Sequence, residues 1–588
     1  MASRYVVEHL HHLGIVAEVC REIGVADWLD QQEPGNRQQV SVGTATVALV
    51  LNGLGFSNRR LYLVPQFFAD KPVEHLLGPG IMAEDLNDDC LGRTLDWLYA
   101  HDVTRLFAGL ALRARRACGI EVGRLHADTT SFAVHGHYAL ELPEGLETPE
   151  ALTAAAQSGT AGAAAGDEDE EDEEDEEDAG APTVIEVTYG YSRDHRADLK
   201  QWMLALVTSG EGVPQFLQPL DGNASDKRTL LEAVQALTQQ LKASGETPGV
   251  YVADSGLYGA ENMTRLNATG VHWVSRVPET STAAQTIVQE RLATLDGWHS
   301  SHDGTRHWWS REKPDLVQGP ERWSVVRTQE GEERARATLQ RQAERDQQTW
   351  EKRLWHLGNQ TFACAPDAEA ALARACQRLP PWFVVVSAAV AQVGYAARGR
   401  PRKDAAPRPQ GWQIQATLTR DPVALEREAL RRTAFLVATN LLDTDAWPDE
   451  AVIALYREQT VVERGFAFLK DPLFLASSVF VKRPERIMAL AFVMTLCLLV
   501  YKLAEVRLRH RLAQTGQTVP DQKGKPTARP TLRWLFQVFE GIDLHHTLHP
   551  GGTRATEVLR LTKVHRLVLR LLGPAYENGY LTFQETAE

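Results

Sequence analysis

Apolar residues recur at helical spacing through the first 118 residues of the chain. The runs VVEHLHHLGIVAEVCREIG and DCLGRTLDWLYAHDVTRLFAGLALRARRAC place apolar side chains three and four positions apart. This spacing is typical of helices that bury one face. We therefore predict a helical N-terminal domain over residues 1–118, although no helix-turn-helix pattern is clear within it.

From about residue 120 the period becomes strand-like. We predict three adjacent strands in VGRLHADTTSFAVHG, TVIEVTYGYS and LKQWMLALVTS. A helix in DKRTLLEAVQALTQQLKASG follows, then a strand in GVYVADSG, a helix in GAENMTRLNATG and a strand in HWVSRVP. Sequential strands followed by alternating helices and strands predict an α/β fold, with a mixed sheet covered by helices as in a ribonuclease H-like core.

After Pro278 this pattern is interrupted by a tryptophan-rich region with strand-like pieces and one charged helix, EERARATLQRQAERDQQTWEKRLW. The α/β pattern resumes with the strand AFLVATNLL and a helix over WPDEAVIALYREQTVVERGFAFLK. The core is therefore predicted to be split in sequence. The expected segments are the N-terminal domain, a first part of the core over 119–285, an inserted β-rich subdomain over 286–415, a second part of the core over 416–505, and a helical C-terminal region over 506–588.

Composition agrees with a globular protein of several domains. The 588 residues are 43% hydrophobic and 24% charged, which excludes a wholly disordered or membrane-embedded chain. The six cysteines form no C-x-x-C pair, so neither a zinc knuckle nor a disulfide framework is indicated. The first residues lack the apolar segment of a secretory signal. We expect a cytoplasmic protein.

The net charge of -15 comes mainly from one segment. Residues 167–178 are 12 consecutive acidic residues, and without them 65 Asp and Glu remain against 62 Lys and Arg, a balance of about -3. Small residues flank the run, so we predict a disordered insertion over 146–182. Two interpretations stay open: a solvated spacer, or a DNA-mimicking brake that competes for a basic groove.

The most apolar segment of the chain is IMALAFVMTLCLLVY, residues 487–501. It is 15 residues long, whereas a membrane-spanning helix needs about 20. We predict that it is a helix buried in a large core, and we expect no membrane partner.

Three acidic residues are candidates for a catalytic site. Asp128 follows VGRLHA and Asp254 follows GVYVA, each at a strand, while Glu463 lies in the last helix of the core. If the first and fourth strands are neighbours, the two aspartates can meet and the helix can supply the glutamate. Such an all-oxygen cluster suits two Mg²⁺ ions, or Mn²⁺ in their place, which promote phosphoryl transfer from about 3.5 to 4 Å apart.

The helix around Glu463 carries a regular set of functional side chains. Tyr456, Glu463 and Lys470 are seven residues apart, which is about two turns, so one continuous helix would present all three on one face with Gln459 nearly in line. A lysine at this position can bind a phosphate group, and a tyrosine can stack on or hydrogen-bond to a nucleic-acid base. A solvated helix with an ordinary i, i+7 stripe is the alternative.

With these residues the chain resembles the DDE transposases of bacterial insertion sequences, in the group with a Y-x2-R-x3-E-x6-K signature. Tyr456, Glu463 and Lys470 match that signature, whereas Gln459 replaces its arginine. Arg457 and Arg464 are the candidates to take the place of that arginine. The segments HADTTSFAVHGHY, YGYSRDHRADLKQW, VADSGLYGAEN and ERGFAFLKDPLF extend the resemblance over about 120–505.

The resemblance implies an enzyme that binds terminal inverted repeats, cuts them in a Mg²⁺-dependent reaction and joins the new 3′-hydroxyl to target DNA. Asp128, Asp254 and Glu463 would hold the metal ions. A homodimer in a synaptic complex is expected in the bacterial cytosol, associated with the nucleoid. Two other functions remain possible from the sequence: a catalytically silent DNA-binding relic, and a nuclease of the same fold without strand transfer.

Two features of the inserted region suggest further DNA contacts. In relatives an insertion tryptophan receives a flipped base, which makes Trp298, Trp308, Trp309 and Trp323 candidates, although tryptophans at strand spacing more often belong to the core. The segment ARGRPRKDAAPRPQGW contains Arg400 and Arg402 around a Gly-Arg-Pro and resembles a short minor-groove reader. An exposed loop between two strands explains it equally well.

Overall fold

The structure is a computed structural model that separates the chain into two compact units. The first unit comprises residues 1–252 and 458–588, and the second comprises residues 253–457. The described residues are 4–33, 39–56, 63–134, 183–191, 196, 198–294, 296–394, 408–471, 483–548, 553–581 and 586–587. The acidic run 167–178 and the basic segment with Arg400 and Arg402 lie outside them.

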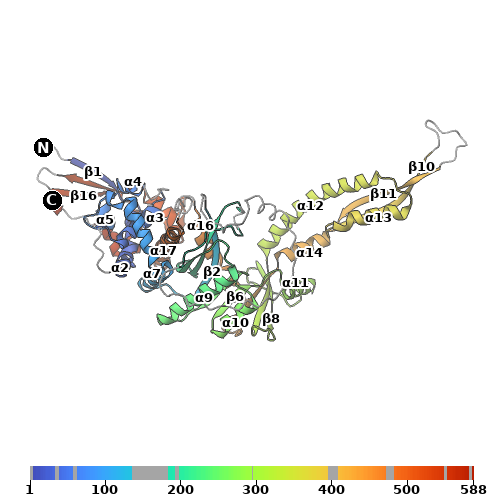
Figure 1. Cartoon of the computed structure of the whole chain (residues 1–588), viewed down its shortest axis with the longest axis horizontal. Helices are drawn as coiled ribbons and strands as arrows, with labels where there is room; N and C mark the ends of the chain where they lie inside the picture. Colours follow the sequence, from blue (N-terminus) through green and yellow to red (C-terminus); the bar gives the residue numbers. More distant parts are fainter. Residues whose placement is uncertain are drawn as a thin grey trace, which may run out of the picture. The chain divides into compact units, whose positions relative to one another are not determined.

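An apolar helix, α17 (Pro484–Thr515), runs through the centre of the first unit (Figure 1). Residues 487–501 are all buried, because α17 packs against α1, α3, α6 and α7 of the N-terminal segment. Within the described ranges it is the one helix long and apolar enough to cross a membrane, but 94% of its most apolar window is buried inside the protein. The prediction of a buried core helix is confirmed.

The N-terminal segment is mostly helical, as predicted, and it shares one hydrophobic core with α17 and with the first strands of the sheet. Its elements are β1 (Arg4–His9), α1 (Leu13–Glu22), α2 (Val25–Asp30), α3 (Val42–Leu54), α4 (Val64–Phe68), α5 (Val73–Leu77), η2 (Ala83–Leu86), α6 (Asp88–Ala100) and α7 (Val103–Cys118).

A small antiparallel sheet joins the two ends of the chain, in the order β1-β15-β16-β17. The sequence predicts helix for Arg4–His9, but this segment is a strand because its backbone pairs with Asp543–Leu548. His9 Nδ1 lies 2.7 Å from Asp543 Oδ1, and His546 Nε2 lies 2.7 Å from Glu8 Oε2. The C-terminal region, predicted helical, is mixed: β13 (Val519–Pro520), β14 (Pro526–Thr527), α18 (Leu532–Val538), β15 (Asp543–Leu548), β16 (Thr553–Leu559), α19 (Lys563–Leu572), α20 (Pro574–Leu581) and β17 (Thr586–Ala587).

The largest sheet has nine strands in the order β4-β3-β2-β5-β6-β12-β9-β8-β7, which confirms a mixed α/β fold. In the first unit β3 pairs antiparallel with both β2 and β4, and α9 packs on these three strands. The predicted strand TVIEVTYGYS contributes one isolated bridge, Thr188 to Gln201, so β4 is the third strand instead. The elements are β2 (Arg124–Ala133), β3 (Gln201–Ser209), β4 (Pro214–Leu220), α9 (Asp226–Ala243) and β5 (Val250–Ala253).

In the second unit β12 pairs antiparallel with β6 and with β9. Part of the predicted insertion therefore extends the large sheet. The elements around this sheet are α10 (Ala260–Ala268), β6 (His272–Arg276), α11 (Thr282–Thr294), β7 (His299–Ser300), β8 (Arg306–Lys313), β9 (Glu321–Thr328), β12 (Phe435–Thr439) and α15 (Asp449–Arg457).

The rest of the insertion forms what we call the helix–hairpin module. A separate two-stranded hairpin, β10–β11, lies alongside the long helix α12 (Figure 1). Leu339, Ala343 and Phe383 belong to a small core of its own. The module consists of α12 (Gln329–Gly358), α13 (Ala365–Ala375), η3 (Cys376–Arg378), β10 (Phe383–Gly394), β11 (Arg408–Arg420) and α14 (Pro422–Thr433).

Candidate active site

Asp128 lies inside β2 and is 8% exposed. Its carboxylate Oδ1 accepts a hydrogen bond from the backbone N–H of Thr129 at 2.7 Å. Because side chains alternate along a strand, Asp128 shares one face of the sheet with Phe132, and its cross-strand partner on that face is Leu206 of β3.

Helix α16 (Thr460–Leu469) crosses this same face. It packs on β2, β3 and α17, with Val462, Phe466 and Leu469 buried. Gly465 lies at this contact: a Cβ at this position would lie 3.3 Å from Cδ2 of Leu498 and 3.8 Å from Cδ2 of Leu206. Since Leu206 is the partner of Asp128, the helix lies over the face that carries the aspartate.

Two of the predicted site residues lie in or directly after α16. Glu463 is exposed in the first turn of α16, two residues before the contact at Gly465. Lys470 follows the last turn, and its Nζ lies 5.7 Å from the centre of the Phe132 ring. Asp128, Glu463 and Lys470 therefore come from two elements that pack on each other within the first unit.

Asp254 begins the second unit and directly follows β5, the strand next to β2 in the sheet. It is half-buried and opens a turn, with Oδ1 accepting a hydrogen bond from the N–H of Gly256 at 2.8 Å. Its backbone carbonyl accepts a second hydrogen bond from the Ser275 hydroxyl at 2.8 Å. The backbone around this carboxylate is thus fixed by local contacts.

The prediction of one continuous helix from Trp447 to Lys470 is wrong. α15 ends at Arg457 and α16 begins at Thr460. Glu463 and Lys470 can therefore lie on the same helix face, whereas Tyr456 belongs to a different helix. The carboxylate of Glu458, at the break, accepts bonds of 2.8 and 2.9 Å from Nη1 of Arg124.

The remaining predicted residues of this segment differ in exposure. Tyr456 lies in α15 with its ring centre 5.8 Å from that of Phe435. Gln459 is the N-cap residue of α16 and is 7% exposed, whereas Arg457 and Arg464 are exposed. The glutamine that replaces the expected arginine is therefore a buried residue at the start of a helix.

The residues that the structure describes contain no group of three or more His, Cys, Asp or Glu side chains arranged to hold a metal ion. The carboxylate triad therefore stays a prediction. Its donor set is nevertheless chemically suited to a hard divalent cation, because all three side chains offer carboxylate oxygens.

A histidine lies beside Asp128 on the same face of β2. His126 is fully buried, and neither ring nitrogen has a hydrogen-bond partner among the described residues. Burial, and secondarily the nearby charge of Arg124, lowers the pKa of His126 to about 4. The ring is therefore neutral at pH 7.

A buried polar cluster that the sequence did not reveal anchors the loop after Asp254. The Tyr258 hydroxyl and the Trp323 indole N–H both donate to Oε2 of Glu321, at 2.7 and 2.6 Å. Glu321 is fully buried, and its Oε1 has no partner in the described part of the chain. Burial raises the pKa of this carboxyl above its ordinary value, and the two donors oppose the shift. The one sequence signal for this cluster is a glutamate directly before the apolar strand segment RWSVV.

Because of this cluster, we predict that the stability difference between the native chain and a Glu321→Gln variant depends on pH. A carboxyl whose pKa is raised in the folded state stabilises the fold below its ordinary pKa of about 4.3, and this contribution is lost as the pH rises through the folded-state value. We expect Glu321→Gln to become progressively more stable relative to the native chain as the pH rises above 4.3. Urea unfolding at pH 4 and pH 8 measures this difference.

Glu321→Ala serves as the comparison, because it leaves the Tyr258 hydroxyl and the Trp323 N–H without an acceptor. We expect a loss of about 1–3 kcal/mol at both pH values. A stability difference between Glu321→Gln and the native chain that does not change with pH would contradict this account.

The tryptophans proposed for base stacking are buried or packed against arginine side chains within the second unit. Trp308 and Trp323 are buried. Trp298 and Trp309 are half-buried beneath the guanidinium groups of Arg327 and Arg291, each 4.5 Å from its ring centre. Trp355 of α12, which was not among the candidates, is 65% exposed.

Comparison with known families gives two matches. Residues 174–500, more than half of the chain, match the model of the transposase DDE domain. Residues 5–112 match a domain of unknown function, DUF4277. No curated protein matches the chain.

Proposed function

The chain belongs to the family of transposases with a DDE domain, and from this premise we propose that it cuts DNA at transposon ends and joins those ends to target DNA. The proposed catalytic residues are Asp128, Asp254 and Glu463, in a core of the ribonuclease H type. The observation that supports the proposal is the packing of α16, the helix that carries Glu463, on β2, the strand that carries Asp128.

The three carboxylates would hold two Mg²⁺ ions, or Mn²⁺. When bound, these ions would lower the pKa of the attacking hydroxyl and neutralise charge on the phosphate. The neutral His126 beside Asp128 adds no positive charge that would compete with a cation. The chain's carboxylates thus supply the anionic site, and its cationic residues supply the contacts to DNA.

Two phosphoryl transfers account for the reaction. In the first, a water oxygen attacks the phosphorus, the bond from phosphorus to the 3′-oxygen breaks, and that oxygen takes a proton to become a 3′-hydroxyl. In the second, this hydroxyl attacks a target phosphodiester, loses its proton, and displaces the 3′-oxygen of the target strand. Each step exchanges one P–O bond for another, so no covalent protein intermediate is required.

Lys470 would bind a phosphate close to the cleaved bond, and Tyr456 would contact the DNA end. Arg457 and Arg464 are exposed, and we propose that they contact the DNA backbone. Gln459, the N-cap residue of α16, is also a proposed DNA contact, although its side chain is buried. Arg400 and Arg402 remain proposed DNA contacts outside the described residues. A homodimer that pairs two transposon ends, acting on nucleoid DNA in the cytosol, completes the proposal.

An end-joining assay tests this function. The full chain is mixed with labelled fragments of the element's own ends and a supercoiled plasmid, in Mg²⁺ or in EDTA. We expect cut ends and a joined product in Mg²⁺ and neither in EDTA.

Two other outcomes would overturn the proposal in different ways. Binding of the ends without cutting would support the silent relic. Cutting without a joined product, and without preference for the end sequence, would support a nuclease.

A further inference from the structure

Asp254 stands at the start of a short loop that is attached to the large sheet at both of its ends. The loop comprises residues 254–258 and leads from β5 toward α10. At its first residue, the backbone carbonyl of Asp254 accepts the hydrogen bond from the Ser275 hydroxyl of β6. At its last residue, the Tyr258 hydroxyl donates to Oε2 of Glu321 in β9 at 2.7 Å. The segment that presents the Asp254 carboxylate is therefore fixed at two points within the second unit.

The two attachment points lie on one face of the sheet. Ser275 of β6, Ala438 of β12 and Trp323 of β9 are directly opposite one another in register, so their side chains form one row. Glu321 precedes Trp323 by two residues and therefore shares its face. The loop that begins at Asp254 is thus held on two neighbouring rows of a single sheet face.

The attachment at Tyr258 excludes water. Glu321 is fully buried, and Tyr258 and Trp323 are 8% and 3% exposed. The Tyr258 ring lies edge-on to that of the buried Trp273, with ring centres 6.1 Å apart. Because a buried hydroxyl cannot exchange its protein partner for water, loss of this hydrogen bond leaves a buried polar group unsatisfied. The bond therefore favours one position of Tyr258.

Inside the loop, two backbone amides bond to Asp254 itself. The N–H of Gly256 donates to Oδ1 of Asp254 at 2.8 Å, and the N–H of Leu257 donates to the Asp254 carbonyl at 3.3 Å. Leu257 is fully buried, and its own carbonyl accepts a hydrogen bond of 3.0 Å from the side-chain amide of Asn262 in α10. Since both amides lie between Asp254 and Tyr258, a shift of Tyr258 moves the groups that orient the carboxylate.

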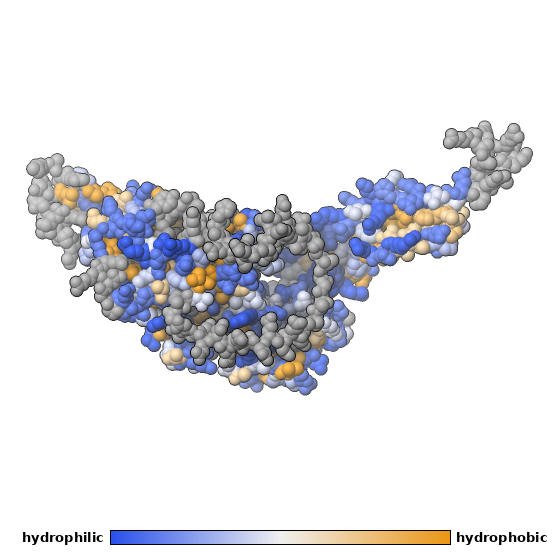
Figure 2. Space-filling view, viewed as in Figure 1, coloured by the Kyte–Doolittle hydropathy of each residue, from blue (hydrophilic) through white to orange (hydrophobic). Residues whose placement is uncertain are grey.

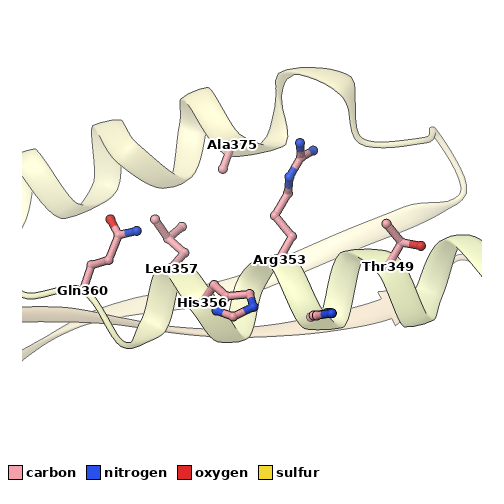
Figure 3. A pocket seen from close by; sticks show the side chains of 7 residues that line it. Thr349, Arg353, His356, Leu357, Gln360 and Ala375 are labelled. Atoms are coloured by element: carbon pink, nitrogen blue, oxygen red, sulfur yellow. The ribbon is translucent and has the colours of Figure 1, made fainter.

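Hollows on the helix–hairpin module are built differently. One of about 580 Å³ lies on α12, and another of about 410 Å³ lies where α12 meets α13 (Figure 3). Every polar side chain that lines them is exposed, and Figure 2 shows hydrophilic surface along α12. Exposed polar groups can bond to water, whereas the buried carboxylate of Glu321 depends on its protein donors.

We propose that Tyr258 and Glu321 are positioning residues for Asp254: their hydrogen bond holds the loop that presents the Asp254 carboxylate to a divalent cation. This role rests on the proposed function, in which Asp254 is one of three metal-binding carboxylates. Removal of a group that orients a metal-binding side chain commonly lowers metal affinity or activity by about 10–100-fold. Neither Tyr258 nor Glu321 contacts the cation itself.

Cleavage measured against Mg²⁺ concentration tests this role in the full chain. Tyr258→Phe removes the hydroxyl and keeps the ring. Tyr251→Phe is the matched control, because Tyr251 is fully buried three residues before Asp254 and its hydroxyl bonds to Thr238 of α9. We expect Tyr258→Phe to need about tenfold more Mg²⁺ for half-maximal cleavage, with an unchanged KM for the end fragment. Tyr251→Phe should keep the native Mg²⁺ requirement.

Two substitutions of Glu321 add a rescue test. Glu321→Gln keeps an oxygen that can accept the hydrogen bonds from Tyr258 and Trp323, so its Mg²⁺ requirement should stay within about threefold of native. Glu321→Ala removes the acceptor and should raise the Mg²⁺ requirement as much as Tyr258→Phe does. A shift that is equally large in the glutamine and alanine variants would overturn the proposal.

Hydrogen exchange in EDTA measures the attachment without a metal ion and without activity. The amides of Gly256 and Leu257 report on it directly, because both donate to Asp254. We expect them to exchange about tenfold faster in Tyr258→Phe than in the native chain, because local opening becomes easier. In Tyr251→Phe they should exchange at the native rate.

The outcomes separate this role from the proposed function. An unchanged Mg²⁺ requirement or unchanged amide exchange in Tyr258→Phe, or equal changes in Tyr251→Phe, would overturn the positioning role while native cleavage leaves the function standing. A native chain that does not cleave its end fragments would overturn the proposed function, and the positioning role would fall with it.

Discussion

Asp128→Asn and Glu463→Gln are each expected to slow strand cleavage by about a thousandfold or more. Loss of one metal-binding carboxylate removes several kcal/mol of transition-state stabilisation, and each 1.36 kcal/mol corresponds to a factor of ten in rate. Asparagine at position 128 keeps an oxygen that can accept the hydrogen bond from Thr129. The fold should therefore survive, and single-turnover cleavage of end fragments in Mg²⁺ measures the loss.

Glu458→Gln provides a control in the same segment. Glu458 is five residues from Glu463, but its carboxylate binds Arg124, and a surface ion pair of this kind contributes about 0–1 kcal/mol. This variant should keep the native cleavage rate within about threefold. If Glu463→Gln and Glu458→Gln cleave equally fast, Glu463 is not the catalytic glutamate. Binding of the end fragment in EDTA should remain near native in all three variants.

Phe492→Ala is expected to cost about 3–5 kcal/mol of stability in the first unit, the largest loss from any single substitution considered for this protein. Phe492 is fully buried in α17, and its ring lies edge-on to Phe107 of α7 with centres 6.2 Å apart. The large side chain leaves a cavity that neighbours in a close-packed core refill only partly. Urea unfolding followed by far-UV circular dichroism measures the change.

Two comparisons separate cavity formation from a general effect of substitution. Phe492→Leu keeps most of the volume and should cost clearly less than the alanine variant. Val423→Ala removes a side chain that is 64% exposed and should change stability by less than about 0.5 kcal/mol. An alanine variant no less stable than Phe492→Leu would show that α17 is not packed as described.

The local sequence pattern was sufficient to predict an element's type and burial wherever the spacing of its apolar residues matched the way it packs in the fold. The strand containing Asp128, the helix after Ser225 and the apolar helix at 487–501 were all predicted from their spacing alone. The carboxylates Asp128, Asp254 and Glu463 were selected because they stand at strands or on a core helix. Their joint action in a metal site remains a prediction from the sequence and the family.

Most differences between the prediction and the structure arise where a segment pairs with a partner that is far away in the sequence. Arg4–His9 is a strand because it pairs with Asp543–Leu548, a partner more than 500 residues away that no local window contains. Glu321 was missed for the same reason, since its donors Tyr258 and Trp323 meet it only when the sheet has formed.

The sequence by itself determined the α/β class, the buried helix α17 and the identity of the candidate carboxylates, because each depends on residue type and local period. The tertiary structure alone decided the break between α15 and α16 and the packing of α16 on β2. The physical reason is that these features depend on which surfaces pack together. A helical period shows that one face will be buried, and only packing shows what covers it and which charges remain free on the other side.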